Sequence, residues 1–373
     1  MKTLKNLWNV FARDPVLTVS LVLAIGSAFW IPPGAGYLAY IDWRVLALLL
    51  SLMLVVAALG QAGLFDLVMA WLLQKVRDTR TLAAVLVGVC FFAAMLITND
   101  VALITFVPLT LLLTEQTGTG RLAIPVIVLQ TVAANLGSAL TPLGNPQNLY
   151  LYSLSGMSVG RFLRVMAPVA GVSVLLLAGA LLFIPRESLG AAEVPLNRPN
   201  RRTLLLWSGE FLLCLLAVLR VVHFGIALGA VVLTALFLDR ALLRRADYGL
   251  LLTFIFFFIF VGNIGAIPPV SETLSALVAG REMTVGILLS QIISNVPAAM
   301  LLSGFTGDYP ALLLGVNLGG LGTLIASMAS LISYKLYAAG KEASKGRYLA
   351  AFTAVNLLFL ALLWAAVSLL YGK

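Results

Sequence analysis

Hydrophobic residues make up 61% of the 373-residue chain and charged residues only 10%, whereas soluble domains are about 45–50% apolar and about 25% charged. Together with a mean hydropathy of +1.05, this excludes a soluble protein and predicts an all-α polytopic membrane protein. The net charge of +9 does not indicate a nucleic-acid partner, because the basic residues lie in short clusters between apolar runs, as cytoplasmic loops do.

The first half of the chain is predicted to combine complete membrane spans with interrupted ones. Several runs reach the roughly 20 apolar residues that cross a bilayer, but the run at 101–113 is too short. A basic segment, Met1–Arg13, precedes the first run without a clear cleavage site after it, so we expect a retained first helix rather than a signal peptide. The predicted elements are Pro15–Trp30, Trp43–Leu59, a short connecting helix Leu64–Val76, Thr81–Ile97, Val101–Leu113, Leu122–Leu140 and Phe162–Ile184.

A polar linker at 185–202 divides the chain almost in half, and the second half repeats the order of the first. We therefore predict a first repeat at 1–184 that includes the N-terminal helix, and a second repeat at 203–373. The predicted elements of the second half are Thr203–Val222, Ile226–Leu238, Tyr248–Val261, a short helix Val270–Val278, Val285–Ile293, a Gly- and Ser-rich stretch up to Tyr337, and Leu349–Leu370.

Two pairs of motifs identify the repeat. A Thr-Asn-Asp at 98–100 interrupts an apolar run in the first half, and a Ser-Asn-Val at 294–296 does so in the second. Each is followed by an Asn-Leu-Gly, at 135–137 and 317–319, that leads into a second interruption. An Asp-aromatic pair opens the matching span of each half, and we expect Asp42 and Asp247 to cap these helices.

The charge pattern predicts that the two repeats have opposite orientations in the membrane. The basic N-terminus belongs in the cytoplasm by the positive-inside rule, and the loop at 31–41 after the first crossing has no Lys or Arg. Counting crossings puts Asp42 outside and Asp247, which follows three arginines, inside. The basic loop at 341–347 is then cytoplasmic and the C-terminus lies on the periplasmic or extracellular side.

Inverted repeats with interrupted helices at matching places point to a transport site. Broken backbone is tolerated at membrane depth only where it is buried in protein or lines a wet cavity, so we expect the motifs at 98–100 and 294–296 to form the tips of two re-entrant hairpins that face two broken helices. Half-helix N-termini suit an anion, and exposed carbonyl groups suit a cation. The candidate substrate- and ion-binding residues are Thr98, Asn99, Asp100, Asn135, Thr141, Gly144, Asn145, Gln147, Asn148, Ser294, Asn295, Asn317, Thr323, Ser327 and Ser330. The candidate Na⁺ ligands among them are Asn99, Asp100, Asn145 and Asn295.

Asp100 is the most informative single residue, because Val296 takes its place in the second half. An ionisable group at membrane depth is functional by default. Asp100 is expected to bind a cation, to carry the coupling proton, or to do both by competition. The structural alternative is that it caps the second half-helix. Glu210 and Arg220 lie near the ends of one predicted span, where their side chains are expected to snorkel to the interface.

The motifs LITNDVAL (96–103), LTPLGNPQN (140–148) and QIISNVP (291–297) resemble the citrate-transporter-like families of the ion transporter superfamily. These families include arsenite permeases, NhaD-type antiporters and divalent-anion symporters, and the likeness is greatest to the YbiR-like inner-membrane proteins. The resemblance covers nearly the whole chain. It implies an elevator-type transporter of the inner membrane, usually a homodimer, with scaffold and transport domains drawn from both repeats. In the divalent-anion symporters each tip carries Ser-Asn-Thr, which binds sodium and substrate; here the third place is Asp100 or Val296, which weakens the expectation of two such sodium sites.

The leading functional prediction is a secondary active transporter that moves a small anion or oxyanion, coupled to H⁺ or Na⁺. The alternatives are a Na⁺/H⁺-type cation antiporter, an exporter of arsenite-like metalloids, and a pore-type channel. An enzyme is not expected, because the sequence has no Ser/His/Asp set, HExxH motif or paired aspartates. No resident cofactor is expected beyond the coupling ion, and the partners are a small ionic substrate, membrane lipid and a second copy of the chain.

Overall fold

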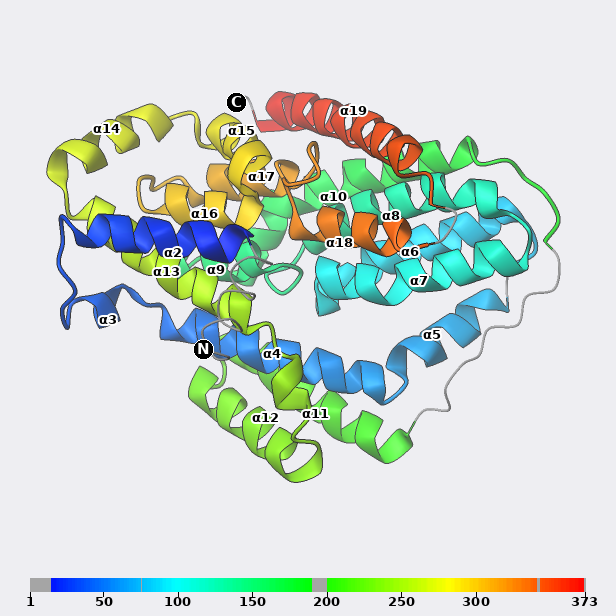
Figure 1. Ribbon diagram of the computed structural model, residues 1–373, viewed down its shortest axis with the longest axis horizontal. Helices are drawn as coiled ribbons and strands as arrows, with labels where there is room; N and C mark the ends of the chain where they lie inside the picture. The colour runs from blue at the N-terminus through cyan, green and yellow to red at the C-terminus, as the bar shows by residue number, and fades with distance from the viewer. Residues whose placement is uncertain (1–14, 75, 190–199, 341–342, 372–373) are drawn as a thin grey trace, which may run out of the picture.

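The computed structural model describes residues 15–74, 76–189, 200–340 and 343–371 (Figure 1). Within these ranges the chain is helical, and the β-pairing is one isolated bridge between Asp78 and Ser188. The helices are α2 (Pro15–Ala28), α3 (Tyr37–Tyr40), α4 (Trp43–Gln61), α5 (Leu64–Leu73), α6 (Thr79–Ile97), α7 (Asn99–Gln116), η1 (Gly120–Leu122), α8 (Ala123–Ser138), α9 (Pro146–Ser155), α10 (Val159–Leu182), α11 (Arg201–Val218), α12 (Phe224–Leu238), η2 (Leu242–Arg245), α13 (Tyr248–Gly265), α14 (Pro268–Val278), α15 (Glu282–Ile293), α16 (Asn295–Ser303), α17 (Tyr309–Leu318), α18 (Met328–Ala338) and α19 (Lys345–Tyr371).

Six helices in the described ranges are long and apolar enough to cross a membrane, and a bent pair, α14 and α15, raises the number to seven if it forms one span. The two members of this pair meet at 106°. Many large apolar side chains are exposed on the surface of the protein, as expected where the surroundings are lipid rather than water. The chain is therefore a multi-pass membrane protein. The six are α4, α6, η1 with α8, α10, α13 and α19.

The two aspartates that open matching spans cap their helices as predicted. The Asp42 carboxylate accepts a hydrogen bond from the backbone N–H of Val45 at 3.0 Å, at the start of α4. The Asp247 carboxylate accepts one from the N–H of Leu250 at 2.9 Å, at the start of α13. Each carboxylate satisfies a backbone donor that has no partner within its helix.

Two helical hairpins lie at the places where the apolar runs are interrupted. One residue, Thr98, separates α6 from α7, and one residue, Ser294, separates α15 from α16. The break is therefore narrower than the sequence suggested, because Asn99 and Asp100 already belong to α7.

Two further helices are interrupted by longer breaks rich in small residues. Residues 139–145 separate α8 from α9, and residues 319–327 separate α17 from α18. Close packing holds α8 against α6 just before the first break, where a Cβ on Gly137 would lie 2.0 Å from the carbonyl oxygen of Phe91. Only glycine allows the two backbones to approach so closely.

The helices form two groups, which Figure 1 shows in the lower left and the upper right. In the frame group (α2, α3, α4, α11, α12 and α13), α2 packs on α13, and both α11 and α12 pack on α4. In the hairpin group (α6 to α10 and α15 to α19), α8 packs on α6 and α7, α17 on α15, and α18 on α7. The groups meet where α4 contacts α9 and where α13 contacts α16.

Three predictions concern residues outside the described ranges. These are the basic segment Met1–Arg13 before the first span, the middle of the linker at 190–199, and the start of the basic loop at 341–342. Elsewhere the predicted helices are present with shifted ends. The connecting helix α5, for example, ends at Leu73 rather than at Val76.

Candidate functional site

The two hairpin tips share an uncommon backbone conformation. Thr98 has φ 74° and ψ 152°, and Ser294 has φ 75° and ψ 155°. Residues other than glycine rarely adopt this region, and they persist there only when the surrounding structure holds them. Both angles agree within 3° although the two segments are almost two hundred residues apart, so the two tips have the same local backbone structure.

Each tip is held by the break of the neighbouring interrupted helix. The backbone N–H of Asn99 donates to the carbonyl of Gly144 at 3.1 Å, and the N–H of Asn295 donates to the carbonyl of Ala326 at 2.9 Å. Gly144 and Ala326 are the residues before the cap of α9 and the cap of α18, respectively. The tips and the breaks therefore meet at equivalent points.

The Asn of the first Asn-Leu-Gly reaches across to the second break. The side-chain oxygen of Asn135 accepts hydrogen bonds from Asn99 Nδ2 and from Ser327 Oγ, both at 3.0 Å. Its Nδ2 donates to Ser330 Oγ at 3.3 Å. All four side chains are at most 4% exposed, and this cluster links both halves of the chain.

The Asn of the second Asn-Leu-Gly makes the reciprocal contacts with the first break. Asn317 Nδ2 donates to Asn148 Oδ1 at 2.7 Å, and Asn317 Oδ1 accepts from Asn145 Nδ2 at 3.1 Å. Asn145 also caps α9 by accepting from the backbone N–H of Asn148 at 2.9 Å. Buried amides that satisfy one another in this way fix the breaks in one arrangement.

A large cavity of about 560 Å³ lies against the first tip and the first break. Frame-group residues from α4 and from the segment before α13 form its opposite wall. Its volume falls within the range of small-molecule sites. The charged residues that line it are Asp66, Asp100, Arg245 and Asp247, and its polar lining also includes Gln61, Thr98, Thr105 and Asn145.

Asp100 presents an unpaired carboxylate to this cavity. It occupies the first turn of α7, and its backbone N–H donates to Asn99 Oδ1 at 3.0 Å. Within the described residues, no hydrogen bond to its carboxylate oxygens is found, so Asp100 does not cap α7, and the capping alternative is wrong. An unpartnered carboxylate beside a cavity is an acceptor for a proton or a metal cation.

Arg245 brings the cavity its guanidinium group. With the Gln61 amide oriented to satisfy its neighbours, the side-chain oxygen accepts from Arg245 Nη1 at 2.7 Å and its nitrogen donates to Asp239 Oδ2 at 3.2 Å. Arg245 and Gln61 are both exposed, so this pair lies at the solvent-accessible edge of the cavity.

The predicted site residues divide between the cavity and the buried network. Thr98, Asp100 and Asn145 line the cavity. A second set lies buried: Asn99, Asn135, Gly144, Gln147, Asn148, Ser294, Asn295, Asn317, Ser327 and Ser330. Thr141 donates to the carbonyl of Met95. Thr323 is exposed and bonds to Gln291 instead of joining either set.

Sequence reasoning missed Gln291 and the charged residues of the opposite wall. The side-chain amide of Gln291 reaches the second break, since its Nε2 donates to the carbonyls of Gly319 and Leu321, both at 2.9 Å. Its place in the motif at 291–297 was a usable signal. Asp66 and Arg245 gave no such signal, because a charge near a helix end usually lies in a solvated loop.

The candidate Na⁺ ligands do not converge as one set of free oxygens. Asn99 Oδ1 and Asn145 Oδ1 each accept a backbone hydrogen bond, and Asn99 and Asn295 are 4% exposed. The described ranges hold no group of three His, Cys, Asp or Glu side chains able to bind a metal ion. Asp100, with Asn145 near the same cavity, is the part of the set that is accessible to a cation.

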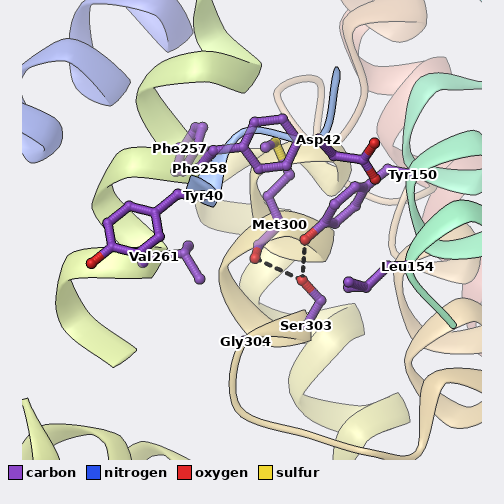
Figure 2. Close-up of a pocket in the computed structure, with 11 residues that line it drawn as sticks. Tyr40, Asp42, Tyr150, Leu154, Phe257, Phe258, Val261, Met300, Ser303 and Gly304 are labelled. Carbon is purple, nitrogen blue, oxygen red and sulfur yellow. Dashed lines mark hydrogen bonds between the residues drawn. The ribbon is translucent and has the colours of Figure 1, made fainter. Parts of the chain in front are cut away.

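A small pocket of about 210 Å³ lies between α13 of the frame group and the helices α9 and α16 of the hairpin group. Tyr150 and Ser303 are hydrogen-bonded at 2.7 Å, and Ser303 also donates to the carbonyl of Met300. Figure 2 shows Asp42 close to Tyr150 and Tyr40 farther away. Counted from Asp42 and Asp247, the same positions of α4 and α13 line the two spaces: Leu52, Met53, Val56 and Ala57 in the large cavity, and Phe257, Phe258, Val261 and Gly262 in the small pocket.

Comparison with known proteins assigns the chain to a family. Residues 7–311 match the citrate transporter family, CitMHS. The chain belongs to this family. This member is 33% identical to the inner membrane protein YbiR of Escherichia coli over 336 residues, which cover 87% of this chain and 88% of that one. It is 31% identical to the uncharacterized transporter MJ0456 of Methanocaldococcus jannaschii over 299 residues, covering 79% and 81%. A Dictyostelium discoideum protein named arsB is 28% identical over 128 residues, covering 34% of this chain and 22% of that one.

Proposed function

We propose that this member of the citrate transporter family is a secondary active transporter that moves a small anion or oxyanion and is coupled to H⁺ or Na⁺. The observation that carries the proposal is the unpaired carboxylate of Asp100 in a cavity where half-helices begin. Ionisable groups at membrane depth mark ion pathways and proton relays. The coupling ion binds at Asp100, and the substrate binds beside it.

The charge balance at the first tip explains how the cation and the anion are coupled. Residues at the N-termini of α7, α9 and α18 line the cavity, namely Val101, Pro146 and Met328. Each half-helix N-terminus contributes about half a positive charge, so the three together exceed the single negative charge of Asp100. A proton or Na⁺ on Asp100 therefore leaves the site positive and able to accept an anion.

The reciprocal contacts support a pair of inverted repeats. Asn135 bonds to the second break as Asn317 bonds to the first, and corresponding positions of α4 and α13 line two separate spaces. An inverted pair places such spaces on opposite faces of the membrane. By the positive-inside rule, the large cavity, with Arg245 at its edge, faces the cytoplasm.

Alternating access follows from movement of the hairpin group against the frame group in the manner of an elevator. In such a movement the site stays intact, because the amide network lies wholly within the hairpin group. The large cavity closes and the small pocket opens as the group moves. A homodimer joined through frame helices provides a fixed support for this movement.

The proposal is tested by reconstituting the purified protein into vesicles and measuring uptake of anions and oxyanions under imposed pH or Na⁺ gradients. Asp100→Asn is expected to abolish coupling and to flatten the pH or Na⁺ dependence of uptake, because the site can no longer gain and lose a charge. Asp66→Asn is the matched control, since it removes a carboxylate from the same cavity but away from the half-helix termini. Uptake by Asp100→Asn with unchanged pH and Na⁺ dependence refutes the role of Asp100.

A cation antiporter of the Na⁺/H⁺ type is the second candidate, and the net charge of the cavity favours it. Three carboxylates but only one guanidinium line the described wall. Such a site exchanges Na⁺ for H⁺ at Asp100 without any anion. Recovery of a quenched pH dye after Na⁺ is added to anion-free vesicles selects this candidate, and export of a neutral metalloid is tested by growth on arsenite.

A further inference from the structure

Four hydrogen bonds connect the frame group to the C-terminal end of α9. Arg220, in the loop between α11 and α12, donates to the carbonyls of Tyr152 at 3.1 Å, Gly156 at 3.3 Å and Ser153 at 3.5 Å. Ser153 Oγ donates to Asp42 Oδ2 at 3.2 Å. Arg220 and Asp42 of the frame group therefore both bond to one short stretch of the hairpin group, the end of α9.

The backbone conformation of Arg220 is one that favours glycine, which indicates that the arginine side chain has a role at this position. Arg220 has φ 63°. Its N–H donates to the carbonyl of Ala217 at 3.1 Å, and the N–H of Val221 donates to that of Leu216 at 2.9 Å. This pattern ends α11 in a Schellman motif, and the position that Arg220 occupies in such motifs is usually glycine. Arginine adopts this conformation less readily than glycine, but it adds a long cationic side chain at this position.

The guanidinium of Arg220 is well matched to the end of α9. The last carbonyls of a helix have no partner within the helix, and a cation at this end is favoured by the helix dipole. The guanidinium carbon also lies 5.1 Å from the ring centre of Tyr152, within the range of a cation–π contact. Asp42 completes the contact with one carboxylate oxygen while the other caps α4.

The opposite end of α9 carries the candidate site. Asn145 caps its first turn, and Asn145 and Asn148 both bond to Asn317. The helix is ten residues long, about 15 Å at 1.5 Å per residue. A contact that fixes one end of this short rigid rod also fixes the height of the site relative to the frame group.

We propose that Arg220 and Asp42 form a latch that holds α9, and with it the site, in the position where the large cavity reaches Asp100. The latch opens before the site faces the small pocket, because its four hydrogen bonds join groups that move past each other. This inference rests on the proposed function, in which the hairpin group moves against the frame group. Arg220 acts through α9 and does not contact the site, so it is a positioning residue.

The latch is tested by measuring the accessibility of the small pocket. Ser303 lines this pocket from the hairpin group and is 4% exposed (Figure 2), and Ser303→Cys supplies a nearly isosteric thiol. Both native cysteines are buried, so the unsubstituted chain serves as the blank. A membrane-impermeant maleimide is added from the side of the small pocket. A second reporter, Thr105→Cys, lines the large cavity and is labelled from the other side.

Arg220→Gly removes the guanidinium and retains the backbone conformation, so the end of α11 is preserved. We expect it to speed labelling of the Ser303→Cys reporter roughly tenfold, which corresponds to about 1.4 kcal/mol, and to slow labelling of the Thr105→Cys reporter. Ser153→Ala should give a smaller change in the same directions. Arg240→Gln is the matched control, because the exposed Arg240 donates to the carbonyl of Leu236 near the end of α12, within the frame group, and its labelling should match that of the parent.

Several outcomes overturn the latch. Unchanged labelling of both reporters in Arg220→Gly does so, and so does faster labelling of both, which indicates local unfolding around a helix cap. An equal effect of Arg240→Gln shows that the frame group has loosened as a whole. Labelling needs no substrate, which separates the two proposals: latch-dependent labelling in a protein that transports no ion rejects the proposed function alone, and transport with latch-independent labelling rejects the latch alone.

Discussion

Asn317→Leu removes an amide that ties the second Asn-Leu-Gly to the first break. The side chain is 3% exposed and makes three hydrogen bonds, to Asn145, to Asn148 and to the carbonyl of Leu313. At about 1 kcal/mol each, their loss costs about 3 kcal/mol. Within the described residues Asn148 Oδ1 then has no donor, which adds about 1–3 kcal/mol, while burial of the leucine returns about 2 kcal/mol. The expected net loss is about 2–4 kcal/mol.

Asn356→Leu is the matched control on α19. Asn356 is also fully buried, but its Nδ2 donates only to the carbonyl of Phe352 at 2.9 Å and its Oδ1 has no partner among the described residues. Replacement with leucine removes an unsatisfied acceptor, worth about 1–3 kcal/mol, at the loss of one hydrogen bond. We therefore expect a neutral or stabilising effect from the same chemical change.

The two variants are compared by thermal unfolding of the purified protein in one detergent, followed by intrinsic fluorescence. Since 1 kcal/mol shifts the midpoint by about 2–4 °C in a domain of 150–250 residues, Asn317→Leu should lower the midpoint by at least about 4 °C, and Asn356→Leu should leave or raise it. A midpoint of Asn317→Leu at or above that of the unchanged protein refutes the reasoning. Equal shifts of both variants also refute it, because they mean that the amide contacts of Asn317 contribute nothing specific.

Two further predictions concern the packing of α8 and the start of α6. Gly137→Ala should destabilise the protein by about 1–3 kcal/mol, because the added methyl group overpacks against a backbone carbonyl of α6. Gly179→Ala on α10, where nothing lies within 4 Å of the added methyl group, should stabilise the protein by about 0.5–1 kcal/mol. The same unfolding assay compares the two variants. Hydrogen bonding to the backbone of Thr81, and then the Arg186 side chain, lowers the pKa of Asp78 below its ordinary 3.8. The stabilisation by the ionised carboxylate is therefore present above pH 3.8 and lost as the pH falls through the lowered pKa, so the deficit of Asp78→Asn at neutral pH should disappear in acid; a deficit that persists there contradicts this assignment.

The elements of this protein were largely predictable because their signals are local. Apolar run length predicts the spans, and Asp42 and Asp247 cap helices through hydrogen bonds to residues three positions away. The tips were predictable because a polar motif interrupts an apolar run. That the first break is a single residue was not predictable. Thr98 has φ 74°, the next residue, Asn99, bonds to the distant Gly144, and no sequence preference of threonine indicates that conformation.

The partners within the site were less predictable because they depend on packing between distant segments. The sequence places Asn135 and Asn317 in matching motifs, but only the packed helices show that each one bonds to the break of the other half. Arg220 shows the same limit. It was expected to snorkel to the membrane interface, and instead it bonds to the end of α9, because that helix end offers carbonyls that lack partners.

Under the proposed function, the difference between the two tips decides how many coupling charges accompany each substrate. Both tips have the same backbone angles and the same backbone hydrogen bond to a break, so they offer equal helix N-termini. Only the first tip adds a carboxylate at the cavity, since the residue at the matching place of the second tip is the buried, apolar Val296. A titratable or cation-binding group at one tip alone can change the local charge by one unit. We therefore expect one coupling cation at the tips in each transport cycle, and Asp100 to be the group that binds it.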